Sequence, residues 1–456
     1  MSEEKQSIHG IWSSRWTFVL AATGSAVGLG NIWKFPYIAG ENGGGAFVLV
    51  YLLCIALIGI PIMMGEILLG RRGRKSPINA MQDMARDSGA GSYWSVIGYM
   101  GVLAGIFILS FYSVIAGWAV SYFFKMVSGT FVGADADTVG GIFDGLLADP
   151  VTLTFWHTVF MALTIFVIAK GVNAGLERAI RILMPVLFVL LIVLLGYSVS
   201  SGGFDKGLSF LFSFDLNKAL QPEAFIVALG HSFFTLSLGM GAIMAYGAYM
   251  QKKASIGNTV VTIAILDTLV ALIAGLVIFP IVFSNNLDPG AGPGLMFVTL
   301  PLAFGQMPAG EIFGALFFLL VTFAAWSSAI SLAEPGVAWW VESKGGSRVK
   351  SAIAIGVICW VMGLGTVLSF NHWAEVKLFG RTFFDNLDFL ASNIMLPLGG
   401  LLIAIFVGWF MKQEAVREEL TMEAGGLWSF YQIIIRFIAP ILVLAVFAKA
   451  LGLIEF

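Results

Sequence analysis

The sequence is short of charge, cysteine and histidine, and these shortages exclude several classes of protein. Only 11% of its 456 residues are charged while 58% are apolar, and a soluble chain of this length cannot bury so much apolar surface. Two cysteines, Cys54 and Cys359, cannot build a disulfide framework, and both fall inside apolar stretches. Basic residues form no patch outside the loops that flank those stretches. We therefore expect the lipid bilayer, and no nucleic acid, as a partner.

Apolar stretches of about 18 residues or more recur along the whole chain, and each can cross about 30 Å of hydrocarbon as a helix. Strand-like alternation of apolar and polar residues is absent from them. We therefore predict an all-α membrane protein with about eleven transmembrane helices in one domain, residues 1–456. The predicted spans are residues 15–38, 43–70, 93–127, 153–170, 177–200, 222–250, 257–284, 310–341, 349–371, 382–411 and 428–452.

The distribution of Lys and Arg predicts the orientation of these spans. The polar start of the chain, MSEEKQSIHG, predicts no cleaved signal peptide. Connection 128–152 holds four aspartates and no Lys or Arg, whereas the connections after spans 2, 4, 6 and 8 are basic. The positive-inside rule then places the N-terminus in the cytoplasm and, with eleven spans, the C-terminus outside. The basic residues concerned are Arg71, Arg72, Arg74, Lys75, Arg86, Lys170, Arg178, Arg181, Lys252, Lys253, Lys344, Arg348 and Lys350.

Two of the predicted spans, the first and the sixth, carry clustered glycines near their middle. These glycines are Gly24, Gly28, Gly30, Gly239 and Gly241. Each glycine weakens a helix by about 1 kcal/mol relative to alanine, and the two clusters lie five spans apart. Corresponding interruptions in two halves indicate inverted repeats with a binding site at the bilayer midplane. We predict repeats at about 11–200 and 220–411, followed by an extra helix at about 428–452.

Four sequence strings resemble the neurotransmitter:sodium symporter family. GSAVGLGNIWKFPYIAGENGGGAF (24–47) is similar to the signature of its first span. GIPIMMGEILLGRRG (59–73), FFTLSLGMGA (233–242) and FAAWSSAISLAEP (323–335) are similar to its second, sixth and eighth spans. Short termini and the GMG sequence in span 6 are similar to bacterial members that carry several hydrophobic amino acids. The resemblance implies a sodium-coupled symporter, not an enzyme. It would import hydrophobic or aromatic L-amino acids across a bacterial cytoplasmic membrane by alternating access.

The resemblance also implies two Na⁺ sites beside the break in span 1. The carbonyl of Ala26, the side chains of Asn31 and Thr235, a residue of span 7 and the substrate carboxylate would form the first site. Carbonyls and hydroxyls would form the second: Gly24, Val27, Ala324, Ser327 and Ser328. The alternative for the two serines is a hydrogen bond back to a carbonyl of their own helix.

A substrate site follows from the same resemblance. The hydroxyl of Tyr112 and the amides of Leu29 and Gly30 would hold a carboxylate. The ammonium group would meet carbonyls of Phe234, Thr235 and Ser237. Monoamine carriers have an aspartate at the position of Gly28, so the glycine predicts a ligand that brings its own carboxylate. The full set is Ala26, Leu29, Gly30, Ile108, Tyr112, Phe234, Thr235, Ser237, Met240, Ser328 and Leu332.

Several charged residues within the spans match gates or supports of the family. Lys34 and Asp388 match the outer gate, and Trp12 and Glu342 match the inner gate. The usual inner-gate arginine aligns with His9, so the resemblance supplies no partner for Glu342.

Glu66 matches a glutamate that braces the break in span 6. Gly175 and Pro185 match a span 5 motif that unwinds to hydrate the second sodium site, and a packing glycine beside a tolerated proline is the alternative. Glu334 has no predicted role.

Asp267 departs most clearly from the family pattern. It is the only acid in NTVVTIAILDTLVALIAGLVIFP, at a position where asparagine usually ligates the first sodium ion. Four residues on, where relatives have a chloride-binding serine or a glutamate, this chain has Ala271. We predict that Asp267 supplies the fixed negative charge that chloride supplies elsewhere, so chloride is not required.

Three other functions are alternatives to this one. An intramembrane hydrolase is disfavoured, because the four histidines are scattered and neither HExxH nor GxSxG occurs. A proton-coupled carrier of the same fold would place a lysine or carboxylate near the second cation site, where this chain has Ser327 and Ser328. A sodium-binding receptor that does not translocate would carry the same binding residues. The preferred amino acid, the number of ions and the oligomeric state cannot be read from the sequence.

Overall fold

The structure, a computed structural model, describes residues 7–288, 292–450 and 452–453 of the chain. Within these residues, nine helices are long and apolar enough to cross a membrane. Two further segments, at the predicted first and sixth spans, each consist of two shorter helices. The predicted all-α architecture with about eleven spans is therefore confirmed, and residue 451 of the last predicted span lies outside the described residues.

Some of the nine continuous spans contain a wide π-helical turn that joins two α-helices. Span 2 joins α3 (Gly45–Cys54) to α4 (Ile60–Gly73), span 10 joins α18 (Phe383–Asp388) to α19 (Leu396–Ile405), and span 11 joins α21 (Gly426–Ile433) to α22 (Ala439–Ala450). The other long helices are α6 (Val96–Val127), α8 (Pro150–Ala169), α9 (Arg178–Val199), α14 (Ile256–Ser284), α16 (Gly310–Lys344) and α17 (Arg348–Ser369).

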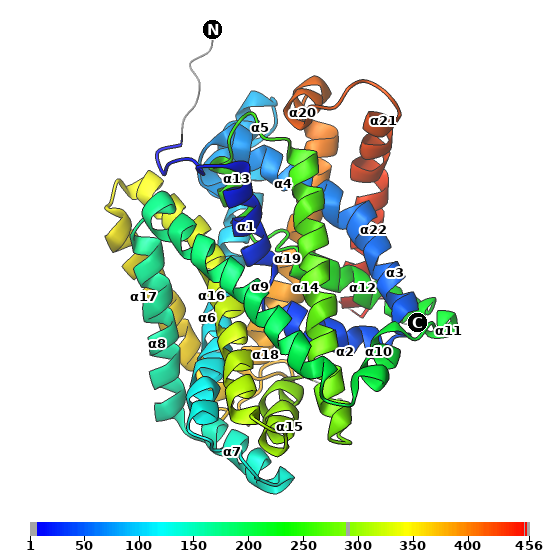
Figure 1. The fold of residues 1–456 in the computed structure, drawn as a ribbon. Helices are drawn as coiled ribbons and strands as arrows, with labels where there is room; N and C mark the ends of the chain where they lie inside the picture. The colour runs from blue at the N-terminus through cyan, green and yellow to red at the C-terminus, as the bar shows by residue number, and fades with distance from the viewer. Residues whose placement is uncertain (1–6, 289–291, 451, 454–456) are drawn as a thin grey trace.

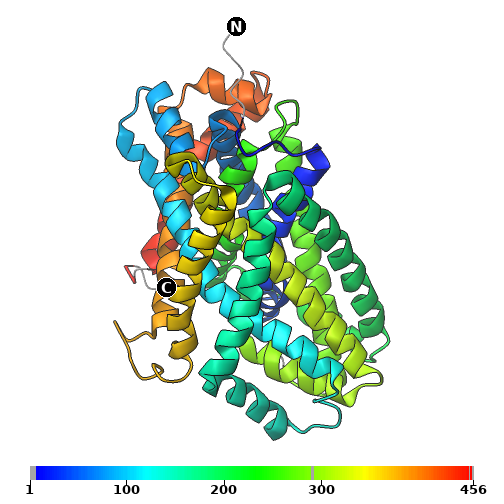
Figure 2. The same cartoon turned by 90° about the vertical axis from the view of Figure 1, so that its left-hand side faces the viewer.

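The N-terminal segment, α5 (Pro77–Asp87) and α20 (Gln413–Leu420) lie at one end of the bundle (Figure 1). We call this the N-terminal end. The opposite end carries α7 (Ala136–Ala148) and α15 (Leu300–Gln306), and the view turned by 90° keeps these ends apart (Figure 2). The longest two helices, α6 and α16, pack against each other through the centre of the bundle. They form one wall of the region where the first and sixth spans are broken.

The connection 128–152, predicted as a loop, contains the helix α7. Asp135 caps it by accepting a hydrogen bond of 2.9 Å from the amide of Thr138. Val139, Phe143 and Leu146 are buried at helical spacing, so the segment hides one apolar face against the bundle. Short helices also occupy other connections: α10 (Phe204–Phe212) and α11 (Leu216–Ala219).

The first span breaks where the glycines cluster. Its first half, α1 (Arg15–Ala26), ends at Val27, whose backbone is extended at φ −70° and ψ 106°. The chain resumes in a wide turn, Gly30–Lys34, that leads into α2 (Phe35–Glu41). The break therefore leaves backbone amides and carbonyls of this stretch without regular helical partners.

The sixth span breaks between α12 (Pro222–Thr235) and α13 (Ala242–Ala248). Ser237, Gly239 and Gly241 have positive φ angles of 55°, 76° and 73°, which stop the α-helix. A Cβ atom on Gly239 would also lie 2.5 Å from the carbonyl oxygen of Leu396, so glycine is required there. The two predicted interruptions are thus present, and both are buried in the middle of the protein.

Candidate substrate and sodium sites

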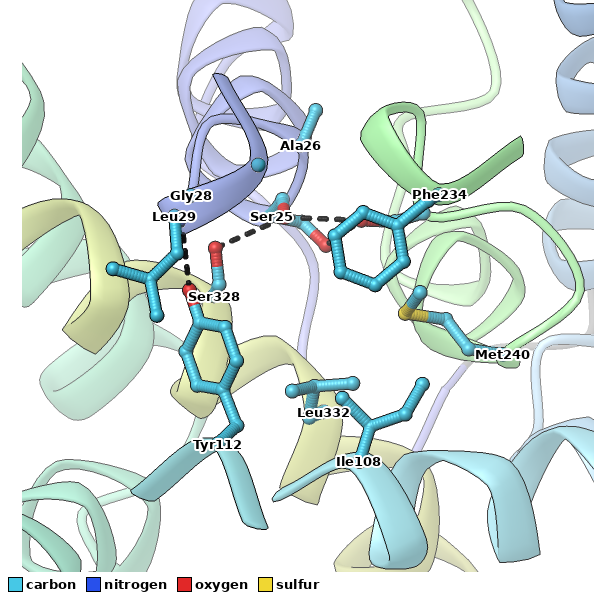
Figure 3. Close-up of a pocket in the computed structure, with 12 residues that line it drawn as sticks. Ser25, Ala26, Gly28, Leu29, Ile108, Tyr112, Phe234, Met240, Ser328 and Leu332 are labelled. Atoms are coloured by element: carbon cyan, nitrogen blue, oxygen red, sulfur yellow. Dashed lines mark hydrogen bonds between the residues drawn. The ribbon is translucent and has the colours of Figure 1, made fainter. Parts of the chain in front are cut away.

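A small cavity lies between the two breaks, with walls from α6 and α16 (Figure 3). Ten of the eleven predicted substrate residues line it, and Ser25 and Gly28 complete the lining. The exception is Thr235, which lies outside this lining and faces span 7. The lining residues are Ser25, Ala26, Gly28, Leu29, Gly30, Ile108, Tyr112, Phe234, Ser237, Met240, Ser328 and Leu332.

One end of the cavity is polar. The hydroxyl of Tyr112 accepts a hydrogen bond of 3.3 Å from the amide of Leu29, and its ring points at the break in span 1 (Figure 3). A Cβ atom on Gly28 would lie 2.8 Å from the Tyr112 hydroxyl and 2.9 Å from the hydroxyl of Ser328. The hydroxyls of Tyr112 and Ser328 can therefore approach the backbone this closely only because residue 28 is a glycine. Amide and hydroxyl donors beside a helix break are suited to binding a carboxylate.

The other end of the cavity is apolar. Ile108 from α6, Leu332 from α16 and Met240 from the break in span 6 point toward one another, with the ring of Phe234 above them (Figure 3). The cavity is small, with a free volume of about 30 Å³. Because Met240 has flexible torsions, its side chain can repack at low cost.

The side chains predicted for the first sodium site meet in a buried cluster. Asn31 donates from Nδ2 to Oδ1 of Asp267 at 2.7 Å and to Oγ1 of Thr235 at 3.0 Å. Thr235 in turn donates to Asp267 at 3.0 to 3.1 Å. All three residues are at most 1% exposed. The cluster therefore joins the breaks of spans 1 and 6 to span 7 with hard oxygen atoms, the ligand type that Na⁺ prefers.

The second predicted sodium site is assembled only in part. The hydroxyl of Ser328 lies 3.2 to 3.3 Å from the carbonyl oxygens of Gly24, Ser25 and Val27, across the gap between α16 and span 1. Ser327 instead donates back to the carbonyl of Ala324 at 3.0 Å. Ser327 thus forms the alternative contact, a hydrogen bond back to a carbonyl of its own helix. Ser328 instead contacts carbonyls of span 1.

A serine cluster at the same place was not predicted from the sequence. The hydroxyl of Ser25 lies 2.7 Å from that of Ser331 and 3.1 Å from that of Ser237, and Ser237 donates to the carbonyl of Ser25 at 2.9 Å. These hydrogen bonds link span 1, span 8 and the break of span 6. The positive φ of Ser237 turns its side chain toward span 1, and no feature of the sequence string signals that angle.

Glu66 lies beside the break in span 6, as the resemblance implies. Its Oε2 accepts a hydrogen bond of 3.1 Å from the amide of Gly239, and its side chain is fully buried on α4. The carboxylate thus satisfies an amide that the left-handed turn leaves without a helical partner. Its bracing role stays a prediction.

The two charges predicted for the outer gate are not paired in the described residues. Lys34 Nζ lies 5.4 Å from the centre of the Phe234 ring. Asp388 accepts a hydrogen bond of 2.7 Å from Ser392 on its own helix. A cavity of about 490 Å³ lies beside them, lined by Lys34, His231, Phe234 and Ser392 among others. Phe234 lines both cavities, so it separates the small site from this larger space.

The N-terminal end is closed over the breaks. Trp12 is 1% exposed, and its amide donates to the carbonyl of Tyr249 at 2.9 Å. The indole of Trp12 donates to the carbonyl of Tyr246 at 3.1 Å. Glu342 does have a partner at this end, since Nε2 of His9 lies 3.0 Å from its carboxylate. The histidine therefore takes the place for which the resemblance supplied no partner.

Glu334, which had no predicted role, belongs to a buried network at the N-terminal end. Its carboxylate accepts a hydrogen bond of 2.7 Å from the hydroxyl of Tyr249 and forms an ion pair with Arg348 at the start of α17. Arg348 also donates to the carbonyl of Ile168 in α8 at 2.9 Å. The network thus ties α8, α16, α17 and the end of α13 together. A buried carboxylate with these two partners has its charge compensated.

Span 5 starts with a wide turn, Val172–Glu177, that contains Gly175 of the predicted motif. A Cβ atom on Gly175 would lie about 2 Å from the carbonyl oxygen of Val167, so this glycine is needed for close packing. Pro185 lies inside α9. Packing therefore explains Gly175 in this conformation, and the unwinding of span 5 stays a prediction.

A membrane-spanning helical bundle with two broken helices around a buried site has the architecture of a secondary transporter. Comparison with known proteins agrees. The sodium:neurotransmitter symporter family model matches residues 9–136 and 144–455. The chain belongs to this family, and it is a sodium-coupled, multi-pass membrane transporter of a small molecule rather than an enzyme.

Individual relatives cover the chain nearly completely. The uncharacterized sodium-dependent transporter YhdH of Bacillus subtilis is 39% identical over 100% of both chains. The uncharacterized sodium-dependent transporter MJ1319 of Methanocaldococcus jannaschii is 30% identical over 95% of this chain and 89% of its own. Among solved structures, MhsT in complex with L-phenylalanine is 46% identical with a TM-score of 0.89, covering 97% of this chain and 99% of that one.

Proposed function

We propose that this transporter is a symporter that imports hydrophobic or aromatic L-amino acids together with two Na⁺ ions and without chloride. The observation that carries the proposal is the cavity between the two helix breaks, which is polar at one end and apolar at the other. An α-amino acid with an apolar side chain is likewise polar at one end and apolar at the other. The similarity to a structure solved in complex with L-phenylalanine supports the same substrate class.

The polar end selects for a carboxylate. Gly28 supplies no side-chain carboxylate at this end, and even a Cβ atom there would lie within 3 Å of the hydroxyls of Tyr112 and Ser328. A ligand that carries its own carboxylate supplies the missing negative charge and contacts the amides of the broken span. In the proposal the same carboxylate also touches the first Na⁺ ion, beside Asn31, Thr235 and Asp267. Substrate and ion then bind together, which is the physical basis of coupling.

The membrane orientation is part of the proposal. The N-terminal end carries the basic connections, including Arg71, Lys75 and Arg181, whereas α7 at the other end follows Asp135 and contains Asp137 and Asp144. The positive-inside rule places the N-terminal end in the bacterial cytoplasm and the other end outside. On this assignment the closed end is the cytoplasmic one, and the larger cavity beside Phe234 opens to the exterior. With eleven spans, the C-terminus is outside.

The substrate class is tested by competition in proteoliposomes that hold an inward Na⁺ gradient. Labelled leucine uptake should be displaced well by leucine, isoleucine, methionine, phenylalanine, tyrosine or tryptophan, and poorly by glycine, glutamate or lysine. Apolar burial of about 0.8 kcal/mol per methylene group favours the larger side chains. Tryptamine should compete at least about tenfold more weakly than tryptophan, because it lacks the carboxylate. A panel led by glycine or by a charged amino acid would overturn the proposal.

The outer gate gives a second test, with a small expected effect. We expect Lys34 and Asp388 to approach each other when substrate is bound, although they are apart in this conformation. Their contact would be partly wet and worth about 1 kcal/mol or less. Asp388→Asn should therefore change the uptake rate measurably, by up to about fivefold, and leave the binding affinity nearly unchanged. Glu375→Gln, on the exposed connection before this helix, is the control for loss of another acid. Identical uptake kinetics in Asp388→Asn and the unmodified protein would remove Asp388 from the gate.

A further inference from the structure

The carboxylate of Glu342 is surrounded by donors at the N-terminal end of the bundle. Oε1 lies 3.0 Å from Nε2 of His9 and 2.7 Å from the amide of Ser76. Oε2 lies 2.6 Å from the hydroxyl of Ser76 and 2.6 Å from Nδ2 of Asn79. An ionised carboxylate has about four acceptor positions, and all four are used here. The arrangement therefore requires that Nε2 of His9 carry a hydrogen and donate it.

This contact fastens the N-terminal segment across the closed end. The side chains of His9 and Glu342 are only 2% and 7% exposed, so water screens the contact little. The His9 ring lies 5.8 Å from the ring of Tyr249, and Trp12 follows with its backbone hydrogen bond to the same tyrosine. Residues 9–12 thus cover the ends of α13 and α16. This end cannot open while His9 stays on Glu342 and Trp12 stays on Tyr249.

We propose that His9 is the cationic partner of Glu342 in a latch whose strength depends on the pH at the N-terminal end. With both ring nitrogens protonated, His9 forms a charge-assisted hydrogen bond to the carboxylate and holds the end closed. With one proton lost, the neutral ring still donates from Nε2, but the ion pair is gone. The latch then opens more readily. This inference rests on the proposed transport function, in which the same end must open to release substrate.

The groups that face His9 leave it as the source of the pH response. From α16 it meets Glu342, and from the end of α13 it meets the phenol of Tyr249. From the start of α5, Ser76 and Asn79 meet the same carboxylate, and both are uncharged. Histidine is the side chain of this set whose ordinary titration falls between about pH 5 and 8.

Two other charged pairs lie near the latch. Lys75 lies next to Ser76, and its Nζ contacts Asp83 at 2.7 Å. Glu334 and Arg348, on the far side of Tyr249, form their own ion pair. The His9–Glu342 contact therefore stands as a separate pair beside these two.

A cysteine reporter can measure the opening of this end directly. Ala338 lies one helical turn before Glu342 on the same face of α16 and is fully buried. The natural cysteines, Cys54 and Cys359, are buried at 1% and 0% exposure, so Ala338→Cys adds the reactive thiol of interest. We would measure its reaction with a polar maleimide in inside-out vesicles at about pH 5.5 and about pH 8. We would divide this labelling rate by the labelling rate of the same reporter in His9→Arg. The ratio cancels the pH dependence of the thiol itself.

The expected result is a ratio that rises about tenfold from the lower to the higher pH, since the difference in strength between a charge-assisted and a neutral hydrogen bond changes an equilibrium constant by about that factor. His9→Gln should label rapidly at both pH values. His372→Gln, on an exposed connection at the other end, should keep the full pH response. A flat ratio, or an unchanged pH response in His9→Gln, would show that His9 is not the latch.

Uptake measurements separate this failure from failure of the proposed function. Sodium-driven uptake is measured with the external pH fixed and the pH on the side of the N-terminal end varied. The unmodified protein should slow as that side becomes acidic, and His9→Arg should be slow throughout. Sodium-dependent uptake with no response to internal pH would overturn the latch and leave the transport proposal standing. Uptake without sodium dependence would overturn the proposed function whatever the labelling shows.

Discussion

Asn31→Ala should lower sodium-driven uptake about 100-fold or more. Asn31 is fully buried, and its side chain holds Thr235 and Asp267 at 3.0 and 2.7 Å while accepting from the amide of Gly28 at 3.1 Å. Alanine removes an oxygen that we assign to the first Na⁺ ion, and it leaves the buried carboxylate of Asp267 with one neutral donor fewer. Losing a hydrogen bond to a charged group costs about 1.5–3 kcal/mol, and losing a ligand adds to it. A loss of about 2.7 kcal/mol already corresponds to a factor of about 100.

The same experiment ranks the two serines of the second site. Ser328→Ala should abolish most of the sodium dependence, because its hydroxyl lies among three carbonyls of span 1. Ser327→Ala should cost less, since that hydroxyl bonds within its own helix. Thr322→Ala is the matched control, because Thr322 on the same helix also bonds back, to Phe318, away from the break. It should transport like the unmodified protein.

Uptake is measured in vesicles with an inward Na⁺ gradient, and binding is measured as thermal stabilisation of the purified protein in Na⁺ against K⁺. A ligand at 100 times its dissociation constant adds about 2.7 kcal/mol of stability, which Asn31→Ala should remove. Full uptake by the unmodified protein in sodium-free buffer, driven by a proton gradient, would contradict the sodium assignment. A control variant as inactive as Asn31→Ala would show that lost folding explains the result.

Much of this fold can be predicted from the sequence, because apolar run length and glycine clustering are strong local signals. The spans and both helix breaks follow from them, and in the structure Gly239 and Gly241 take the positive φ angles that end the helix. The connecting helix α7 does not follow, because its apolar face is short and lies between polar ends. Asp135 can be recognised as the N-cap of this helix only once the helix is known.

The site likewise has a part that can be predicted from the sequence and a part that cannot. Most of the cavity lining follows from the resemblance, because those residues belong to strings of fixed spacing. The Ser25–Ser237–Ser331 cluster and the pairing of Glu334 with Arg348 do not, because each joins residues from different helices. Such contacts depend on how the helices pack, and one sequence carries no record of those distances. For the same reason only the structure supplies His9 as the partner of Glu342.

Replacing chloride by gluconate should leave uptake unchanged, which is the second result with a large consequence. Two Na⁺ ions and one zwitterionic amino acid would together add two positive charges to a poorly solvated cavity. A negative charge about 4 Å away changes the energy by about 4 kcal/mol at an effective dielectric constant of 20. Asp267 is fully buried beside Asn31 and Thr235, and among the described residues no Lys, Arg or His forms an ion pair with it. Its charge is therefore available to the ions.

Asp267→Asn should consequently abolish transport or make it respond to chloride. The amide keeps the shape and the oxygen of the carboxylate but removes its fixed charge, so a mobile anion would have to replace that charge. Ala271, one turn further along α14, is fully buried and small, which leaves no second acid on this face of the helix to compensate. Asp144→Asn in α7 is the control for loss of an acid far from the cavity, and it should transport normally without chloride. Strong chloride dependence in the unmodified protein would show that Asp267 does not carry the compensating charge. Chloride-independent transport by Asp267→Asn would also show that Asp267 does not carry the compensating charge. The cavity would then accept both ions with no fixed anion beside them.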